Sequence, residues 1–118
     1  MTGRTRVLIV EDSVDQAELL RLHLQGAGCD VALVGSAEDA IVAYTDCRFD
    51  LAVVDLRLPG MDGWELVRCM QRDRPALPIA VASVLERKDY PDVAWALPKP
   101  FTKAQVLHVL DGVTGGAA

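Results

Sequence analysis

Residues 51–65 read LAVVDLRLPGMDGWE, and this stretch contains the signals that decide the fold. Its first four residues are apolar without a polar break and lead to Asp55, which is typical of a strand buried on both faces of a parallel sheet. Asp62 with Glu65 has the spacing of a helix-start capping box. The stretch therefore predicts a buried strand that ends at a carboxylate and is followed by a helix.

The same kind of apolar run recurs along the chain, at residues 7–10, 31–34, 51–54, 79–82 and 93–97. Each run is continuous rather than alternating, as in strands that are covered on both faces. Helix-start signals lie between the runs, at Ser13, Ser36, Asp62 and Thr102. Crossovers between such parallel strands are almost always right-handed. We therefore predict an α/β fold, a doubly wound five-stranded parallel sheet with helices on both faces.

The length of 118 residues fits one domain with one core, which we predict over residues 5–114, with a C-terminal tail over residues 115–118. No apolar run approaches the ~20 residues needed to cross a membrane. No secretory signal precedes the first apolar run. We therefore expect a cytoplasmic protein without membrane contact.

The formal net charge is −5, and the Lys and Arg residues are scattered. Because affinity for a phosphate backbone depends on clustered cations, this composition argues against direct nucleic-acid binding. The three cysteines, Cys29, Cys47 and Cys69, lack the close paired spacing of a zinc site. We interpret them as small buried hydrophobes or free thiols in a reducing compartment.

Polar side chains stand where four of the five apolar runs end. Glu11 and Asp12 follow the first run, Asp55 follows the third, and Ser83 and Lys99 follow the last two. Because the carboxyl ends of parallel strands share one edge of the sheet, we expect these side chains to converge. Three carboxylates placed together repel one another unless a cation lies among them. Oxygen-only ligands in a partly open site suit Mg²⁺, so the sequence predicts a magnesium site.

Phosphoryl transfer would give each of these groups a task. Asp55 would attack phosphorus and form an acyl phosphate. Asp12 and Asp55 would bind Mg²⁺ directly, and Glu11 would act through a bound water. Lys99 would pair with one phosphoryl oxygen, and the Ser83 hydroxyl would donate a hydrogen bond to another. The plain alternatives are an ordinary turn hydroxyl for Ser83 and a surface charge for Lys99.

These residues resemble the motifs of a two-component response-regulator receiver domain, over residues 5–114. The matching segments are Val10-Glu11-Asp12, residues 55–63, Pro78-Ile79 ahead of Ser83, and Lys99-Pro100-Phe101. The resemblance implies a flavodoxin-like strand order, 2-1-3-4-5, and phosphorylation of Asp55 by a phosphohistidine on a sensor histidine kinase or histidine phosphotransfer domain. It also implies that the backbone carbonyl of Arg57 completes the metal shell and that the Lys99–Pro100 bond is cis.

Two features depart from the family pattern. Ala96 stands where receivers usually carry an aromatic residue that moves inward when the Ser or Thr turns toward phosphate, and Trp95 is expected on the opposite face of the strand. The span from Ser83 to Lys99 is short for the family by about a turn and a half of helix, and Pro91 interrupts it. We therefore predict a short or irregular fourth helix, without the usual two-position aromatic switch.

Arg57 and Leu85 stand two residues beyond Asp55 and Ser83 respectively. In this family these positions flank the path of the water that attacks the phosphoryl group. A long cation and a branched apolar side chain there predict a phosphorylated state that lasts longer than it would with two small side chains. A solvated surface side chain is an equally open interpretation of Arg57.

The sequence thus predicts a phosphorylation-dependent signalling switch of a two-component phosphorelay, made only of a receiver, which modifies itself and is not a turnover enzyme. Its phosphorylated surface would bind a downstream protein of unknown identity. The alternative is a phosphorylation-independent interaction adaptor, which Ala96 and the reduced fourth helix favour. A metallophosphatase is a remote third hypothesis, because Arg57 replaces the second Asp that would serve as its general acid. No residue pattern identifies a dimer interface, so a homodimer stays open.

Overall fold

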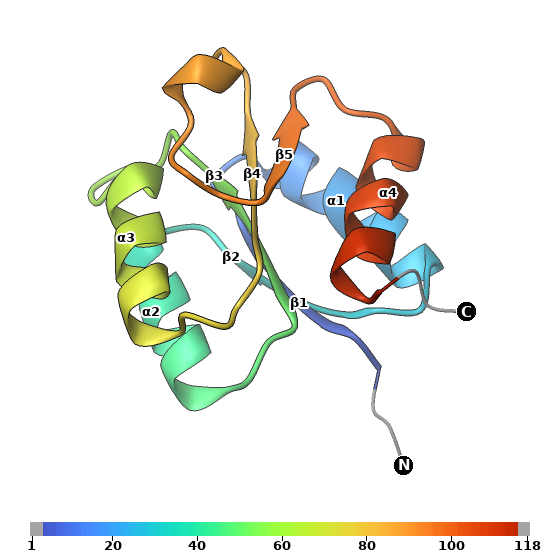
Figure 1. Ribbon diagram of the computed structural model, residues 1–118, viewed down its shortest axis with the longest axis horizontal. Coiled ribbons are helices and arrows are strands. Elements are labelled where there is room, and N and C mark those ends of the chain that lie inside the picture. The colour runs from blue at the N-terminus through green and yellow to red at the C-terminus, as the bar shows by residue number, and fades with distance from the viewer. Residues whose placement is uncertain (1–3, 116–118) are drawn as a thin grey trace.

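A five-stranded parallel sheet forms the centre of the computed structural model, which describes residues 4–115 (Figure 1). The strands are β1 (Arg6–Val10), β2 (Asp30–Val34), β3 (Leu51–Asp55), β4 (Ile79–Ser83) and β5 (Trp95–Pro98). Their spatial order is β2-β1-β3-β4-β5, and every neighbouring pair is parallel. The predicted doubly wound α/β fold and its strand order are confirmed.

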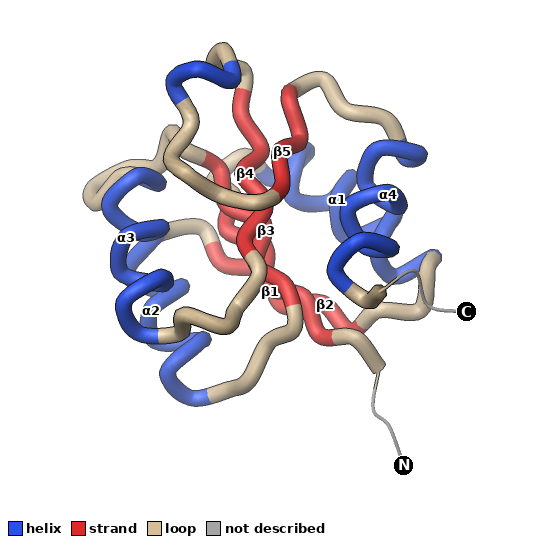
Figure 2. Tube along the Cα trace, viewed as in Figure 1, coloured by secondary structure: helices blue, strands red, loops and turns tan. Residues whose placement is uncertain are grey.

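Helices cover both faces of this sheet, as Figure 2 shows. The helices are α1 (Val14–Gly26), α2 (Ala37–Asp46), α3 (Gly63–Asp73) and α4 (Lys103–Val113). One face packs against α1 and α4, and the other packs against α2 and α3. Because both faces are covered, β3 and β4 are buried along their whole length. This explains why their sequences are continuous apolar runs.

The predicted helix starts are confirmed at all four positions. The side chains of Ser13, Ser36, Asp62 and Thr102 each accept a hydrogen bond from the backbone N–H three residues later. At Thr102 the Gln105 side chain also accepts from the N-cap backbone N–H, which completes a reciprocal capping box. Each cap satisfies a backbone donor that the first turn of a helix leaves without a partner.

The fifth strand begins later than its apolar run predicts. The prediction placed a strand over residues 93–97, whereas β5 covers Trp95–Pro98. Val93 instead packs against the core between the sheet and the α2–α3 layer, and the carbonyl of Asp92 accepts a hydrogen bond from Gln71 of α3. These contacts turn the chain toward α3 before the strand can start.

Trp95 and Ala96 face opposite sides of β5, as expected. The Trp95 ring lies against α4 and makes an edge contact with His108, with ring centroids 6.4 Å apart. A Cβ atom at Gly112 would lie 2.0 Å from the Trp95 ring. Ala96 pairs with Val81, which belongs to the core on the α2–α3 side. The helix α4 therefore has a glycine where the indole crosses it.

The segment of residues 84–94, which we call the strap, replaces a fourth helix between β4 and β5. It contains only one 3₁₀ turn, Arg87–Asp89, so the prediction of a short or irregular helix is confirmed. The strap lies beside α3 (Figure 1). The Trp64 indole N–H donates to the Asp89 carbonyl at 2.8 Å, which fixes the strap to the start of α3.

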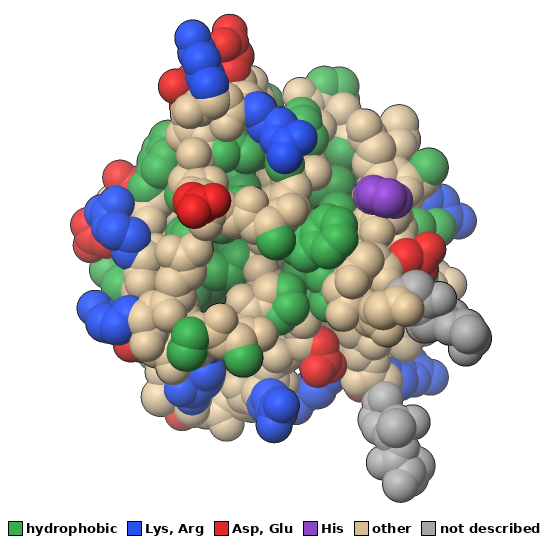
Figure 3. All heavy atoms as spheres, in the orientation of Figure 1, with side chains coloured by type: hydrophobic (Ala, Val, Ile, Leu, Met, Phe, Trp, Pro, Cys, Tyr) green, Lys and Arg blue, Asp and Glu red, His purple; other side chains and the backbone are tan. Residues whose placement is uncertain are grey.

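The described surface agrees with the scattered charge of the sequence. On the face in Figure 3, Lys and Arg side chains are interspersed with Asp and Glu. Within residues 4–115, no helix has the length and apolar character needed to cross a bilayer. All three cysteines are free thiols, and Cys29 is buried as a small hydrophobe. Of the predicted C-terminal tail, residues 116–118 lie outside the described residues.

Gly63 lets the start of α3 approach the end of β3. A Cβ atom at Gly63 would lie 2.3 Å from the carbonyl oxygen of Asp55 and 2.5 Å from the Cα of Leu56. Its backbone N–H donates to the Leu56 carbonyl at 2.9 Å. Because the atoms in the way are backbone, a side chain cannot be accommodated by a rotamer change.

The change Gly63→Ala is expected to lower the free energy of unfolding by about 3 kcal/mol, since it forces α3 and β3 apart. Urea denaturation measures the difference. The matched control is Gly26→Ala at the end of α1, where nothing lies within 4 Å of an added Cβ. That change should alter stability by no more than about 1 kcal/mol. Equal midpoints for the two variants would contradict the close packing described here.

Candidate functional site

Polar side chains from four strand ends meet at the carboxyl edge of the sheet. Glu11 and Asp12 follow β1, Asp55 ends β3, Ser83 ends β4 and Lys99 follows β5. Asp55 pairs with Ala82 across the β3–β4 ladder, so Ser83, the last residue of β4, lies one residue beyond that pair. The backbone N–H of Lys99 donates to the Ser83 carbonyl at 2.8 Å. The sheet therefore brings the predicted polar residues to one place.

Three carboxylates form the acidic part of this site. One oxygen atom from each of Glu11, Asp12 and Asp55 lies within 4.8 Å of the others. Glu11 and Asp55 are only 5% and 7% exposed, whereas Asp12 is exposed. The set offers only oxygen atoms and opens to solvent on the Asp12 side. These are the ligand type and the partial hydration that Mg²⁺ requires, so the residues present fit this ion.

Lys99 compensates part of the negative charge. Its Nζ lies 2.5 Å from Glu11 Oε1 and 3.6 Å from Asp55 Oδ2. Burial raises the pKa of the Glu11 carboxyl, and the hydrogen bond with Lys99 acts in the opposite direction. An ammonium against two buried carboxylates offsets part of the repulsion that their proximity causes.

Backbone donors fix the orientation of the buried carboxylates. The Ser13 N–H donates to Glu11 Oε2 at 3.2 Å, and the Arg57 N–H donates to Asp55 Oδ1 at 3.2 Å. Each donor lies two residues after its carboxylate, in the loop that leaves the strand. Asp55 therefore keeps one oxygen against the backbone and the other toward Lys99.

Ser83 is the most buried polar side chain of the site, at 1% exposed. Its Oγ accepts a hydrogen bond from the Leu85 N–H at 3.1 Å. Its carbonyl accepts from the Tyr90 hydroxyl at 3.0 Å, in addition to Lys99 N–H. Tyr90 was not singled out from the sequence. No local pattern predicts its contact, because the strap must fold back before Tyr90 reaches Ser83.

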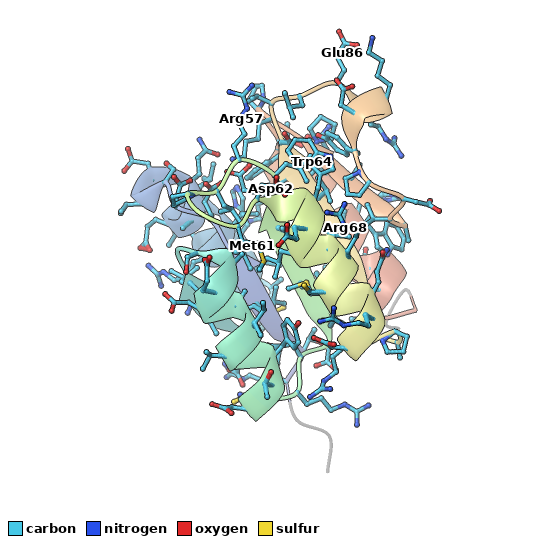
Figure 4. The ribbon with its side chains drawn as sticks, turned by 90° about the vertical axis from the view of Figure 1, so that its left-hand side faces the viewer. Arg57, Met61, Asp62, Trp64, Arg68 and Glu86 are labelled. Atoms are coloured by element: carbon cyan, nitrogen blue, oxygen red, sulfur yellow. The ribbon has the colours of Figure 1, made fainter. Side chains whose placement is uncertain are left out.

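An open depression adjoins the carboxylates. Arg57, Leu85 and Trp64 line it together with Asp12. Figure 4 shows Arg57 on the loop that precedes α3 and Trp64 at the start of that helix. Arg57 is exposed and Leu85 is half-buried, so both predicted gate positions border the open side of the site. Ala96, the other predicted regulatory position, is half-buried in β5.

The Lys99–Pro100 peptide bond is cis, as the resemblance implies. The turn that it forms comes directly after β5 and ahead of Phe101, whose side chain is buried. Lys99 is thereby held between the end of the sheet and the core on the α1–α4 side.

Sequence and structure comparisons both match this chain to known proteins. The family model described as response regulator receiver domain matches residues 7–111. The DNA-binding response regulator MtrA of Mycobacterium tuberculosis is 40% identical over 72 residues, which are 61% of this chain and 32% of that protein. The chain thus spans about a third of the length of the curated relatives that it matches.

Two solved structures illustrate the similarity of the fold. A sensor protein from Polaromonas sp. JS666 is 34% identical, with a TM-score of 0.82, and the match covers 98% of this chain and 100% of that one. The chemotaxis response regulator CheY4 of Vibrio cholerae is 26% identical, with a TM-score of 0.85, and the match covers 94% of this chain and 99% of that one.

The change Lys99→Met, in the absence of divalent metal, is expected to lower the free energy of unfolding at neutral pH by about 3 kcal/mol, because it leaves buried carboxylates without their cation. The pKa of Glu11 is already raised by burial, and loss of the hydrogen bond raises it further. A carboxyl with a raised pKa in the folded state favours folding as it becomes protonated. The deficit should therefore shrink as the pH falls from neutral through the raised pKa of Glu11.

Thermal unfolding in the presence of a chelator, at a series of pH values, measures this effect. Lys103→Met removes an exposed lysine at the start of α4 and is the matched control. A deficit at Lys99→Met that is the same at every pH, or no larger than that of the control, would show that the ammonium does not offset carboxylate charge.

Proposed function

This chain belongs to the response regulator receiver domain family of two-component systems, and on that premise we propose that it is a phosphorylation-dependent switch whose acceptor is Asp55. The observation that carries the proposal is the group of three carboxylates within 4.8 Å of one another, with the Lys99 ammonium against two of them. A plain structural role would not require the fold to bury repelling charges at one edge of its sheet.

The proposed reaction transfers a phosphoryl group from phosphohistidine to Asp55. A carboxylate oxygen forms a bond to phosphorus while the phosphorus–nitrogen bond breaks, and the imidazole that leaves takes a proton from solvent. Because the transition state is loose, the protein acts mainly by positioning the acceptor and stabilising charge. The donor would be a sensor histidine kinase or a histidine phosphotransfer domain.

We assign Mg²⁺ as the cofactor. Asp12 and Asp55 would hold it directly, Glu11 would act through water, and the backbone carbonyl of Arg57 would complete the shell. When bound, the ion supplies positive charge to the phosphoryl oxygens. This assignment is supported by a donor set that consists of oxygen atoms alone.

Lys99 and Ser83 act on the phosphorylated form in this proposal. The Lys99 ammonium contacts Glu11 and Asp55 in the unphosphorylated protein. It would turn to a phosphoryl oxygen once Asp55 carries the phosphoryl group. The Ser83 hydroxyl retains its proton while its oxygen accepts from Leu85 N–H, so that proton is free to be donated to another phosphoryl oxygen.

The reaction modifies the chain itself, so we do not propose a turnover enzyme. MtrA is named as DNA-binding, but this chain spans about a third of that protein, and we propose a protein as the downstream partner. Three further expectations stay predictions. They are that residues 5–114 form one receiver unit, that the chain does not contact nucleic acid directly, and that it is cytoplasmic.

Incubation with Mg²⁺ and acetyl phosphate is expected to add the mass of one phosphoryl group, because the small donor replaces phosphohistidine at the same acceptor. Intact-mass spectrometry measures the product. The adduct should be lost in Asp55→Asn and strongly reduced when a chelator removes the metal. Asp50→Asn, a change in an exposed carboxylate at the opposite end of β3, is the matched control and should keep the adduct.

Absence of the adduct in the unmodified protein would contradict the proposed switch. It would favour the phosphorylation-independent adaptor, for which the small side chain at Ala96 already argues. An adduct that persists in Asp55→Asn would instead place the acceptor elsewhere.

The double change Arg57→Ala and Leu85→Ala is expected to speed the loss of the phosphoryl group by about tenfold, equivalent to about 1.4 kcal/mol in the barrier. Both side chains line the depression beside Asp12 and would restrict the attacking water. The adduct is followed by intact mass after the donor is removed. Arg68→Ala, which changes an exposed arginine farther along α3, should leave the rate unchanged. An unchanged rate in the double variant would remove the gate hypothesis.

A further inference from the structure

Four hydrogen bonds that involve a side chain attach the strap to the rest of the molecule, and one of them runs from the Leu85 N–H to Ser83 Oγ. The Tyr90 hydroxyl donates to the carbonyl of Ser83, the last residue of β4, at 3.0 Å. Trp64 Nε1 donates to the Asp89 carbonyl at 2.8 Å, and Gln71 Nε2 donates to the Asp92 carbonyl at 3.0 Å. The strap is therefore fixed at one side to the end of β4 and at the other to α3. Figure 4 shows Trp64 at the start of α3 and Glu86 on the strap.

Ser83 is the point where the strap meets the acidic site. Its Oγ accepts from the Leu85 N–H, the second residue of the strap. Its carbonyl accepts from both the Tyr90 hydroxyl and the Lys99 N–H. A displacement of Ser83 thus changes bonds to the start of the strap and to its middle at once.

Tyr90 has the contacts needed to transmit a displacement of Ser83 to the rest of the strap. Its ring is half-buried and packs with Leu85, Trp64 and Val93 against the core on the α2–α3 side. Burial raises the pKa of its phenol, so the hydroxyl remains a donor at neutral pH. The ring is rigid, and its neighbours in the chain are bonded to α3 through the Asp89 and Asp92 carbonyls.

Ala96 cannot transmit a displacement of Ser83 in this way. Its methyl group has no hydrogen-bonding atom, and it sits in β5 opposite Val81. Among the described residues, it is the Tyr90 side chain that forms a hydrogen bond with the Ser83 backbone, through its hydroxyl. The connection from Ser83 to α3 therefore runs through the strap.

We propose that Tyr90 is the positioning residue that couples Ser83 to the strap, so that phosphorylation of Asp55 is reported at the start of α3 through Tyr90. The inference rests on the proposed function of Asp55. The phosphoryl oxygens are strong acceptors and draw the Ser83 hydroxyl toward them. Ser83 Oγ then leaves the Leu85 N–H, and the Tyr90 ring transmits the backbone shift to the Asp89–Trp64 hydrogen bond.

The indole N–H signals of the two tryptophans make this coupling measurable by ¹⁵N–¹H NMR. Trp64 donates to the strap, whereas Trp95 packs on α4 across the sheet and serves as the internal reference. The variant Trp95→Phe assigns the two signals. Addition of Mg²⁺ and acetyl phosphate is expected to shift the Trp64 signal in the unmodified protein.

Tyr90→Phe keeps the ring and removes the one hydroxyl. The shift of the Trp64 signal is expected to fall about fivefold, the change in an equilibrium that one lost hydrogen bond of about 1 kcal/mol produces. The matched control is Tyr44→Phe, the chain's other tyrosine, whose hydroxyl donates to Asp73 Oδ2 at 2.7 Å at the far end of α3. This control should retain the full shift.

Intact mass is recorded on the same samples, which separates the coupling from the chemistry. A full adduct in Tyr90→Phe together with a reduced Trp64 shift supports the inference. A full adduct with an equal shift in both tyrosine variants, or with no shift in the unmodified protein, overturns the role of Tyr90 and leaves the switch intact. No adduct in the unmodified protein overturns the proposed function and this inference with it.

Discussion

The contact between the Lys99 ammonium and the buried carboxylates is the interaction on which the arrangement of the site depends. Glu11 and Asp55 lie at the ends of the neighbouring strands β1 and β3 and are both buried, so the charge of each makes ionisation of the other less favourable. Lys99 comes from the far edge strand and lies against both. The charge balance at the site thus links β1, β3 and β5, and any cation or phosphoryl group that enters must rearrange it.

The sheet positions the groups that take part in this charge balance. In a parallel sheet the carboxyl ends of all the strands lie at the same edge. Gly63 allows α3 to start directly against the Asp55 backbone, which closes the site on one side. The strap closes it on the other side, where the chain leaves Ser83 at the end of β4. The acceptor is therefore enclosed by backbone, and Asp12 faces the solvent.

Local signals in the sequence predicted most of this frame. Apolar runs are contiguous, and a helix cap requires only a few neighbouring residues, so strands, helix starts and strand-end carboxylates were predictable. Contacts that depend on how a loop folds back were not. The Tyr90–Ser83 hydrogen bond and the late start of β5 each result from tertiary packing. No pattern of neighbouring residues encodes them.

The chemistry of the strap's attachment has a consequence for its surface. The acceptors on the strap are the main-chain carbonyls of Asp89 and Asp92, and the donors Trp64 and Gln71 belong to α3. The exposed side chains of residues 86–89 take no part in those bonds through their own functional groups. Substitution of these side chains therefore leaves both hydrogen bonds to α3 in place. The charge and shape of the strap surface can thus change while its backbone path stays constant.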